Sequence, residues 1–218
     1  MEIIRAEHVS KEFGCTFRLG PLDLRVAPGE IVEIVGPEGS GKTTLLKLLW
    51  GFIRPDEGCI SIFGMEPHLN QLRLRRRVGY LGPNPRFHSE WTAKQFAQYL
   101  GHFYSGWNEM ETSRLLSYFA IDPNSKIRDL SSGDRTKVAI VSVASHRPEL
   151  LLLDEPTSGI DRASRRAILR FLARLAKERR ISILISCPLS DDLDYLADSI
   201  LMLKNGRVVE YASALQES

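Results

Sequence analysis

A glycine-rich stretch, GPEGSGKT, occupies residues 36–43, directly after the apolar run 31–35 and before a helical apolar pattern at 45–50. It matches the phosphate-loop pattern GxxxxGK[ST] in the strand, loop and helix order that this pattern requires. Glycines let backbone N–H groups turn toward phosphates, and the N-terminus of the following helix adds a partial positive charge. Lys42 can reach the β- and γ-phosphates of a nucleotide, and Thr43 can ligate Mg²⁺. The stretch therefore predicts a nucleotide site formed by Gly36, Pro37, Glu38, Gly39, Ser40, Gly41, Lys42, Thr43 and Thr44.

Two acidic residues follow a second apolar run, LLLL at 150–153. A strand buried on both faces would deliver Asp154 and Glu155 to its carboxyl end, where ligands bind in α/β sheets. Downstream of a phosphate loop, this pattern predicts that Asp154 holds Mg²⁺, directly or through water, and that Glu155 polarises an attacking water. We therefore predict Glu155 and Lys42 as catalytic residues, and Thr43 and Asp154 as metal ligands.

The elements that must position these residues are short apolar runs without strict polar alternation, at 31–35, 78–81, 150–153, 181–185 and 200–203. Such runs are typical of strands buried on both faces. An amphipathic stretch with apolar residues at helical spacing follows Asp161, which is a predicted N-cap. Because strands alternate with helices, we predict an α/β fold: a P-loop NTPase core with a mostly parallel sheet.

Two other regions have different patterns. Short segments at 3–6 and 22–26, broken by glycine and proline, predict an N-terminal antiparallel β layer beside the main sheet. Residues 84–129 are richer in helix formers and aromatics, and predict an inserted α-helical subdomain. The sequence shows no internal repeat, linker or low-complexity tract, so we predict one domain over residues 1–218.

The composition limits the classes of partner. With 29 basic and 27 acidic residues the formal net charge is +2, which gives no support for a nucleic-acid binder. Three widely spaced cysteines suggest neither a disulfide framework nor a zinc site, which favours a reducing cytosol. We see no secretory signal and no apolar run near the ~18 residues of a membrane span. If a membrane is involved, we expect another chain to supply it.

Three further motifs carry a family resemblance. LSSGD at 130–134, LLLLDE at 150–155 and SGID at 158–161 together resemble the nucleotide-binding subunits of ABC ATPases, over nearly the whole chain. The resemblance implies ATP and Mg²⁺ as ligands. It also implies that Ser131, Ser132 and Gly133 form a signature that contacts the γ-phosphate on the opposite subunit. Residues 158–161 would couple the two sites of a head-to-tail dimer.

Physical chemistry agrees with the signature assignment. Ser131 can N-cap the apolar helix that runs to Ala144, so the N–H groups and dipole at that helix start would face an anion.

By the same resemblance, Phe13 falls where the family stacks an aromatic on adenine; the alternative is a core aromatic. The segment 103–116 looks like that of ATP-binding subunits of bacterial exporters of the bacitracin-resistance kind.

The sequence departs from the family pattern at two positions. Where the family usually has a glutamine after a strand like VGYL, this chain has Gly82, Pro83 and Asn84. Where the family usually has a histidine after ILIS, it has Cys187 and Pro188. Asn84 is a candidate to replace the glutamine with a shorter amide side chain, whereas Pro188 offers neither a side-chain donor nor an N–H in place of the histidine.

Two other residues bear on these departures. His146 precedes the 150–153 strand and is expected at the surface, so it does not replace the histidine. Glu38 adds a negative charge to the phosphate loop unless it points to the dimer partner. Nucleotide binding is therefore better supported than turnover.

Alternative functions remain open at this point. The first is the ATP-hydrolysing motor of a transporter, peripheral on the inner face of the cell membrane, that dimerises on ATP and drives separate transmembrane subunits. The second is an ATP-gated clamp or regulatory partner with little or no hydrolysis. A non-transport ABC protein of DNA repair or translation is disfavoured, because 94 residues from Gly36 to Leu130 leave no room for a coiled-coil arm. Homodimer, heterodimer and cargo are not distinguished.

Overall fold

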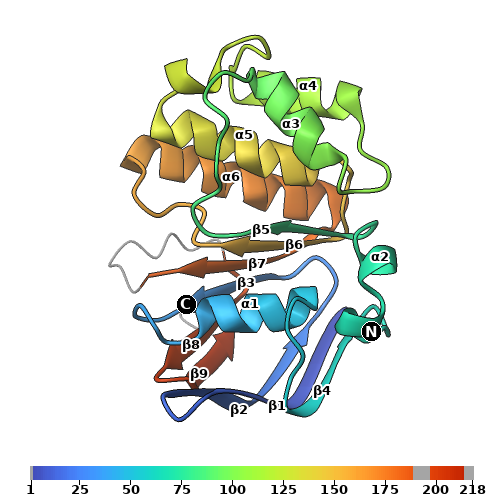
Figure 1. Cartoon of the computed structure of the whole chain (residues 1–218), viewed down its shortest axis with the longest axis vertical. Coiled ribbons are helices and arrows are strands. Elements are labelled where there is room, and N and C mark those ends of the chain that lie inside the picture. Colours follow the sequence, from blue (N-terminus) through green and yellow to red (C-terminus); the bar gives the residue numbers. More distant parts are fainter. Residues whose placement is uncertain (1, 189–196, 214–218) are drawn as a thin grey trace.

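The computed structural model describes residues 2–188 and 197–213 and contains two sheets (Figure 1). The larger sheet has the strand order β5-β6-β7-β3-β8-β9, and the smaller one has the order β2-β1-β4. The strands are β1 (Ile4–Phe13), β2 (Phe17–Val26), β3 (Ile31–Val35), β4 (Glu57–Ile62), β5 (Val78–Leu81), β6 (Leu150–Asp154), β7 (Ser182–Cys187), β8 (Ser199–Lys204) and β9 (Arg207–Ser213). The helices are α1 (Lys42–Trp50), α2 (Gln71–Leu74), α3 (Ala93–Gly101), α4 (Glu109–Tyr118), α5 (Ser132–Ala144) and α6 (Arg162–Arg179), with two 3-10 turns, η1 (Pro67–Leu69) and η2 (Ile127–Asp129).

The strand pairings confirm the predicted α/β class. Strands β5, β6, β7, β3 and β8 pair in parallel, and β9 joins the edge of β8 antiparallel. The predicted N-terminal layer is antiparallel, with β1 between β2 and β4. Its first two strands are 10 residues long each, much longer than the apolar segments that predicted them.

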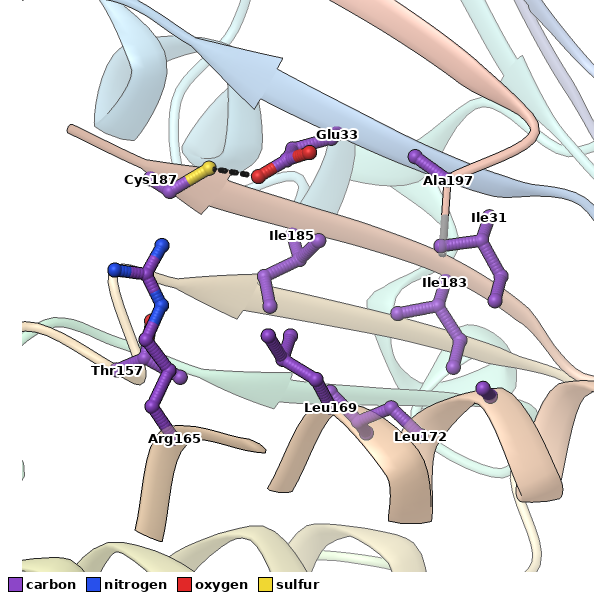
Figure 2. Close-up of a pocket in the computed structure, with 11 residues that line it drawn as sticks. Ile31, Glu33, Thr157, Arg165, Leu169, Leu172, Ile183, Ile185, Cys187 and Ala197 are labelled. Atoms are coloured by element: carbon purple, nitrogen blue, oxygen red, sulfur yellow. Dashed lines mark hydrogen bonds between the residues drawn. The ribbon is translucent and has the colours of Figure 1, made fainter. Parts of the chain in front are cut away.

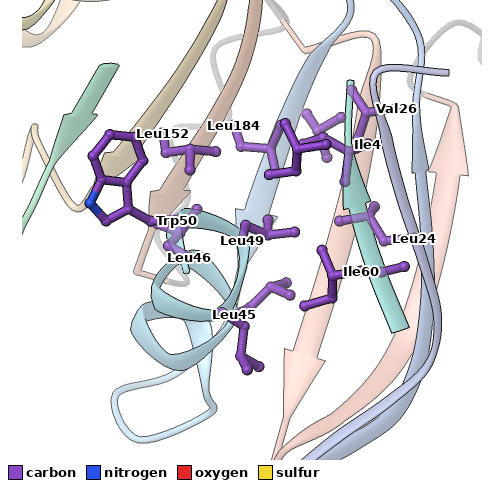
Figure 3. Packing of buried hydrophobic residues seen from close by; sticks show 14 of the residues in the cluster. Ile4, Leu24, Val26, Leu45, Leu46, Leu49, Trp50, Ile60, Leu152 and Leu184 are labelled. Atoms are coloured by element: carbon purple, nitrogen blue, oxygen red, sulfur yellow. The ribbon is translucent and has the colours of Figure 1, made fainter. Parts of the chain in front are cut away.

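Helices cover both faces of the larger sheet. Figure 1 shows α5 and α6 on one face, with α3 and α4 beyond them, and α1 on the other face between the two sheets. Side chains alternate along a strand, so neighbouring residues of β7 enter different cores. Leu184 packs with Leu46 and Leu49 of α1 (Figure 3), whereas Ile183 and Ile185 pack under α6. The sheet therefore separates two hydrophobic cores.

The predicted helix boundaries are confirmed where a capping residue marks them. Asp161 lies directly before α6, and its carboxylate accepts a hydrogen bond from the Ser164 N–H. Gly51 ends α1 with φ +78°, a conformation that glycine adopts without strain. Residues 84–129 contain α3 and α4. None of the described helices is long and apolar enough to cross a membrane.

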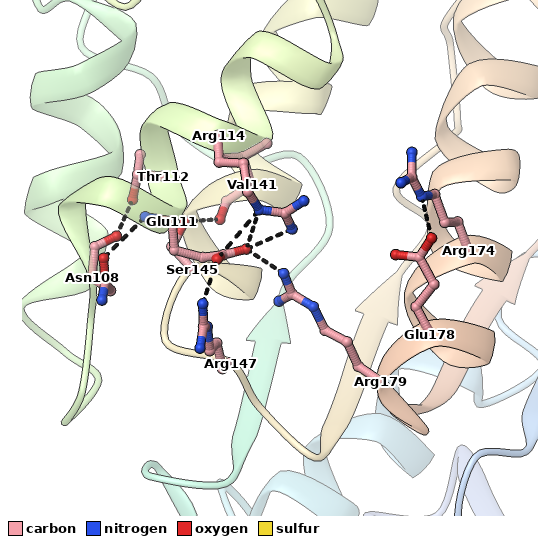
Figure 4. A network of polar contacts seen from close by, with 10 residues as sticks. All are labelled: Asn108, Glu111, Thr112, Arg114, Val141, Ser145, Arg147, Arg174, Glu178 and Arg179. Carbon is pink, nitrogen blue, oxygen red and sulfur yellow. Dashed lines mark hydrogen bonds and ion pairs between the residues drawn. The ribbon is translucent and has the colours of Figure 1, made fainter.

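A buried carboxylate, that of Glu111, binds three arginines and links α4 to α6 and to the turn after α5 (Figure 4). Glu111 of α4 is 2% exposed and receives hydrogen bonds from Arg114 at 2.8 Å, from Arg147 at 3.0 Å and from Arg179 at the end of α6. Burial alone would raise the pKa of Glu111, but the three guanidinium groups outweigh it and lower the pKa to about 2. The Glu111 carboxylate thus connects α4 with α6 and with the turn after α5.

We expect Glu111→Gln to lower the free energy of unfolding by about 3 kcal/mol at neutral pH, because three arginines lose their common carboxylate. The contribution is complete above the ordinary pKa of 4.5 and is lost as the pH falls toward 2. Urea unfolding should therefore show a smaller difference from the wild type at about pH 3.5, by roughly 1.4 kcal/mol.

Glu178→Gln is the matched control. It breaks the pair between Glu178 and Arg174 (Figure 4), whose side chains are both about half exposed, and should cost much less than Glu111→Gln because solvent screens an exposed pair. An equal loss for both variants would contradict a special role for Glu111.

Candidate functional site

The phosphate loop connects β3 to α1 and is packed tightly at its base. A side chain at Gly36 would lie 2.2 Å from the Leu203 carbonyl oxygen and 2.6 Å from the Ser40 hydroxyl, so only glycine fits. Gly41 has φ +108°, which turns the chain directly into the first residue of α1. The free N–H groups at that helix start are a ready anion site.

Lys42 joins this loop to the acidic strand end. Its ammonium is buried and donates hydrogen bonds to the carbonyl oxygens of Gly36 at 2.7 Å and Pro37 at 3.1 Å. It also lies 3.1 Å from Glu155 Oε1. The structure therefore brings together the two residues that the sequence predicted as catalytic, which lie 113 positions apart in the chain.

The two predicted metal ligands also lie together. Thr43 Oγ1 donates a hydrogen bond of 3.1 Å to Asp154 Oδ1, and Ser186 Oγ donates one of 2.8 Å to the same oxygen. Asp154 is completely buried, and this burial raises its pKa despite the two hydroxyl donors. The sequence reading missed Ser186; the only signal was a polar residue near the end of an apolar strand.

Two buried polar atoms in this region fit the ligands that the sequence predicts. Asp154 Oδ2 and Ser40 Oγ have no hydrogen-bond partner among the described residues. A buried carboxylate oxygen without a donor suits a bound cation or its water, and a hydroxyl in a phosphate loop suits a phosphate oxygen. Asp154, Thr43 and the loop therefore fit a Mg²⁺-nucleotide.

The remaining predicted loop residues differ in exposure. Pro37, Glu38 and Gly39 are exposed at the tip of the loop, whereas Thr44 is half-buried in the first turn of α1. Glu38 thus lies on the open side of the loop, where its charge is solvated.

The signature residues lie on the other side of the sheet from the phosphate loop. Ser131 caps α5 as predicted, since its hydroxyl accepts a hydrogen bond of 3.0 Å from the Asp134 N–H. Ser132 is exposed, and Gly133 lies against the start of α6, where a side chain would be 2.2 Å from Ser164 Oγ. The phosphate loop and the signature thus lie at the starts of α1 and α5, which cover opposite faces of the sheet (Figure 1).

A groove of about 290 Å³ connects the acidic strand end with the segment that replaces the expected glutamine. Asn84 lines it together with Asp154, Glu155 and Ser132. Asn84 has φ +48°, a conformation that asparagine tolerates better than most residues. The structure thus places an amide in the groove of the two carboxylates.

Cys187 points toward Glu33, on the face of the sheet that α6 covers (Figure 2). It lines a small cavity between the sheet and α6, and its thiol donates a hydrogen bond of 2.6 Å to Glu33 Oε1. Burial and the nearby Glu33 carboxylate raise the pKa of this thiol well above its usual range. Pro188 is exposed immediately after β7. Cys187 therefore cannot take the place of the histidine on the nucleotide side.

Phe13 is 42% exposed at the end of β1, so the core alternative for this residue is wrong. Its ring centroid lies 6.2 Å from that of Phe17, and Phe17 in turn lies against Gly41 of the phosphate loop. The Phe13 ring is thus available beside the loop.

The expectation for His146 was also wrong. His146 is only 5% exposed and stacks on Tyr104, with ring centroids 4.3 Å apart. Burial lowers its pKa to about 4, which keeps the imidazole neutral. The sequence did not show that Tyr104, in the helical region, would cover it.

A second groove of about 490 Å³ lies on the other side of the 82–85 segment. It is lined by aromatic side chains, among them Trp50, Phe52, Tyr80 and Phe103. Phe52 and Phe103 are each 53% exposed, and Arg75 and Arg86 line the same hollow.

The fold and this site define a nucleotide-binding P-loop domain. Residues 19–158 match the family model described as ABC transporter, and the chain belongs to this family. The chain is 32% identical over 202 residues to the ABC transporter ATP-binding protein NatA of Bacillus subtilis, covering 89% of this chain and 81% of NatA. It is 30% identical over 210 residues to the bacitracin transport ATP-binding protein BcrA of Bacillus licheniformis, covering 95% of this chain and 69% of BcrA.

Solved structures have the same fold. An ATP-binding subunit of an ABC transporter superposes with a TM-score of 0.81 at 27% identity, covering 97% of this chain and 90% of that one. A dimeric ATP-binding cassette in a post-hydrolysis state, bound to ADP and phosphate, superposes with a TM-score of 0.84 at 23% identity, covering 97% and 98%. The chain is thus an ATP-binding subunit of the ABC transporter class.

We expect Lys42→Ala to weaken ATP binding at least about tenfold, or ~1.4 kcal/mol, because its ammonium is the buried cation of the phosphate loop. Calorimetry with ATP measures this directly. Lys47→Ala, an exposed lysine on the same helix, is the control and should bind ATP nearly as the wild type does. Unchanged affinity in the Lys42 variant would overturn the phosphate-loop assignment.

Proposed function

We propose that this chain hydrolyses Mg²⁺-ATP as one half of a head-to-tail dimer and so drives separate transmembrane subunits. The observation that carries the proposal is the meeting of the phosphate loop and the acidic strand end: Lys42 lies 3.1 Å from Glu155, and Thr43 lies 3.1 Å from Asp154. The proposed unit is the whole chain, with residues 84–129 as its helical subdomain.

In this proposal each group has one role. Lys42 and the loop N–H groups bind the phosphates, while Thr43 and Asp154 hold Mg²⁺. The ion would neutralise phosphate charge and orient the γ-phosphate. Glu155 polarises the attacking water from the groove that it shares with Asn84. Phe13 offers its exposed ring to adenine.

The dimer follows from the placement of the signature. Ser131, Ser132 and Gly133 lie at the start of α5, across the sheet from the phosphate loop of their own chain. Their helix N-terminus is suited to an anion, so we propose that it contacts the γ-phosphate held by another nucleotide-binding subunit. That subunit is either a second copy or a related chain, and residues 158–161 lie between the two sites.

We expect ATP to induce this dimer, and Glu155→Gln to prolong it by removing the group that polarises water. Sedimentation of Glu155→Gln should show a dimer with ATP and Mg²⁺ but a monomer with ADP. Glu149→Gln, which changes a carboxylate paired with Arg77 at the start of β6, is the control and should leave dimer lifetime unchanged. A nucleotide-bound variant that stays monomeric would exclude the homodimer.

We further propose that turnover is slow. No histidine follows β7, since Pro188 stands there, and the loop after β5 offers Asn84 in place of a glutamine. A positioned acid, base or charge-stabilising group contributes ~10²- to 10⁴-fold in rate, so the loss of such groups lowers turnover. Glu155 is still present to polarise water, so we expect slow rather than absent turnover.

Pro188→His should therefore raise turnover of the purified protein with ATP and Mg²⁺, while Asn84→Ala should lower it further. The gain in turnover from Pro188→His is partial if the histidine acts as a unit with the glutamine that this chain lacks. Wild-type turnover of several per second that falls on Pro188→His would show a different γ-phosphate contact.

The same two departures favour a second candidate, an ATP-gated clamp or regulatory subunit with little hydrolysis. Co-purification with a membrane subunit distinguishes a transport motor from a free-standing clamp. For the motor we propose a position at the inner face of the cell membrane, held there by that partner.

A further inference from the structure

A buried serine of β7 contacts both acidic residues of the site at once. Ser186 is completely buried and lies opposite Asp154 in the parallel register of β6 and β7. Its hydroxyl donates to Asp154 Oδ1 at 2.8 Å and accepts from the Glu155 N–H at 2.9 Å. A hydroxyl has one proton and two lone pairs, so both contacts are satisfied together.

The first contact sets the orientation of the Asp154 carboxylate. Oδ1 accepts from both Thr43 and Ser186, whereas Oδ2 has no partner in the described part of the chain. Rotation of the carboxylate would take Oδ1 away from two donors, at about 1 kcal/mol for each lost hydrogen bond. Ser186, together with Thr43, thus sets the direction in which the free oxygen of Asp154 points.

The second contact holds the backbone of Glu155. Glu155 has φ +47°, a left-handed conformation that costs a residue with a side chain roughly 1–2 kcal/mol. The N–H of this strained residue is bound by Ser186, and its carboxylate lies 3.1 Å from Lys42. The hydroxyl therefore fixes the point from which the Glu155 side chain leaves the strand.

We propose that Ser186 is a positioning residue that holds Asp154 ready for Mg²⁺ and Glu155 ready for water. This inference rests on the proposed function, since it concerns the same Mg²⁺-ATP site. Ser186 acts through the two acidic residues and does not touch the nucleotide itself.

Ser182 provides a matched comparison within the same strand. It is also completely buried and lies on the same face of β7, four residues earlier. Its hydroxyl donates to the Ala27 carbonyl at 3.0 Å and accepts from the Gly29 N–H at 2.7 Å, and thus joins two backbone groups. Removal of either hydroxyl leaves buried groups unpaired, but only Ser186 is bonded to a carboxylate of the site.

The test compares Ser186→Ala with Ser182→Ala. Calorimetry measures ATP affinity with Mg²⁺ and with EDTA, and a Mg²⁺ titration of turnover gives the half-saturating concentration. We expect Ser186→Ala to weaken ATP binding in Mg²⁺ and to raise the half-saturating Mg²⁺ concentration by about tenfold, with affinity in EDTA unchanged. Ser182→Ala should leave all three values at the wild-type level.

A second pair of variants tests the same role in case Ser186→Ala does not fold. Ser186→Thr and Ser186→Val have the same shape and differ in the hydroxyl, so Thr should preserve the Mg²⁺ dependence that Val loses. If Ser186→Ala and Ser182→Ala show the same Mg²⁺ dependence, or if Ser186→Thr and Ser186→Val do, the role of Ser186 is overturned. Mg²⁺-ATP binding by the wild-type protein would be unaffected by that result. A wild-type protein whose ATP affinity is the same in Mg²⁺ and EDTA would instead overturn the proposed function.

Discussion

A fully buried carboxylate, that of Asp154, is the constraint around which the site is arranged. An ionised group without water is costly unless donors surround it. Thr43 and Ser186 supply two hydroxyl donors to one of its oxygens. Thr43 reaches it only because α1 begins directly after the phosphate loop, and Ser186 only because β7 pairs with β6 in this register. The positions of the loop, α1 and both strands are therefore linked through one side chain.

The parallel sheet separates the two helix starts that we propose as nucleotide contacts. Alternating side chains of buried strands face different layers, with α1 and the phosphate loop on one side and α5 and α6 on the other. The helix start that suits an anion at Ser131 is thereby separated from the loop that suits an anion at Lys42. In the proposed dimer, another nucleotide-binding subunit supplies the helix start that faces the phosphate loop.

Local signals in the sequence were sufficient for much of this arrangement. The 78–81 run is β5, Ser131 and Asp161 cap their helices, and Gly51 ends α1, because each depends on neighbouring residues alone. Contacts between distant segments were not predictable in this way. The register that places Ser186 beside Asp154, and the stacking of Tyr104 on His146, depend on strand pairing and helix packing that no short pattern encodes. Because side chains alternate along β7, Cys187 points to the opposite face of the sheet from Ser186, where its thiol contacts Glu33.

The segment 82–85, where the family resemblance predicts a glutamine, lies where two hollows meet. Gly82, Asn84 and Pro85 line both the groove of Asp154 and Glu155 and the aromatic groove of Trp50 and Phe103. A wall shared by two grooves cannot move without a change in both. Pro83 and Pro85 restrict their own backbone angles and those of the residues before them, and Asn84 between them has positive φ. The wall is thus built from residues with restricted backbone angles, and these hold the Asn84 amide in the groove that it shares with Asp154 and Glu155.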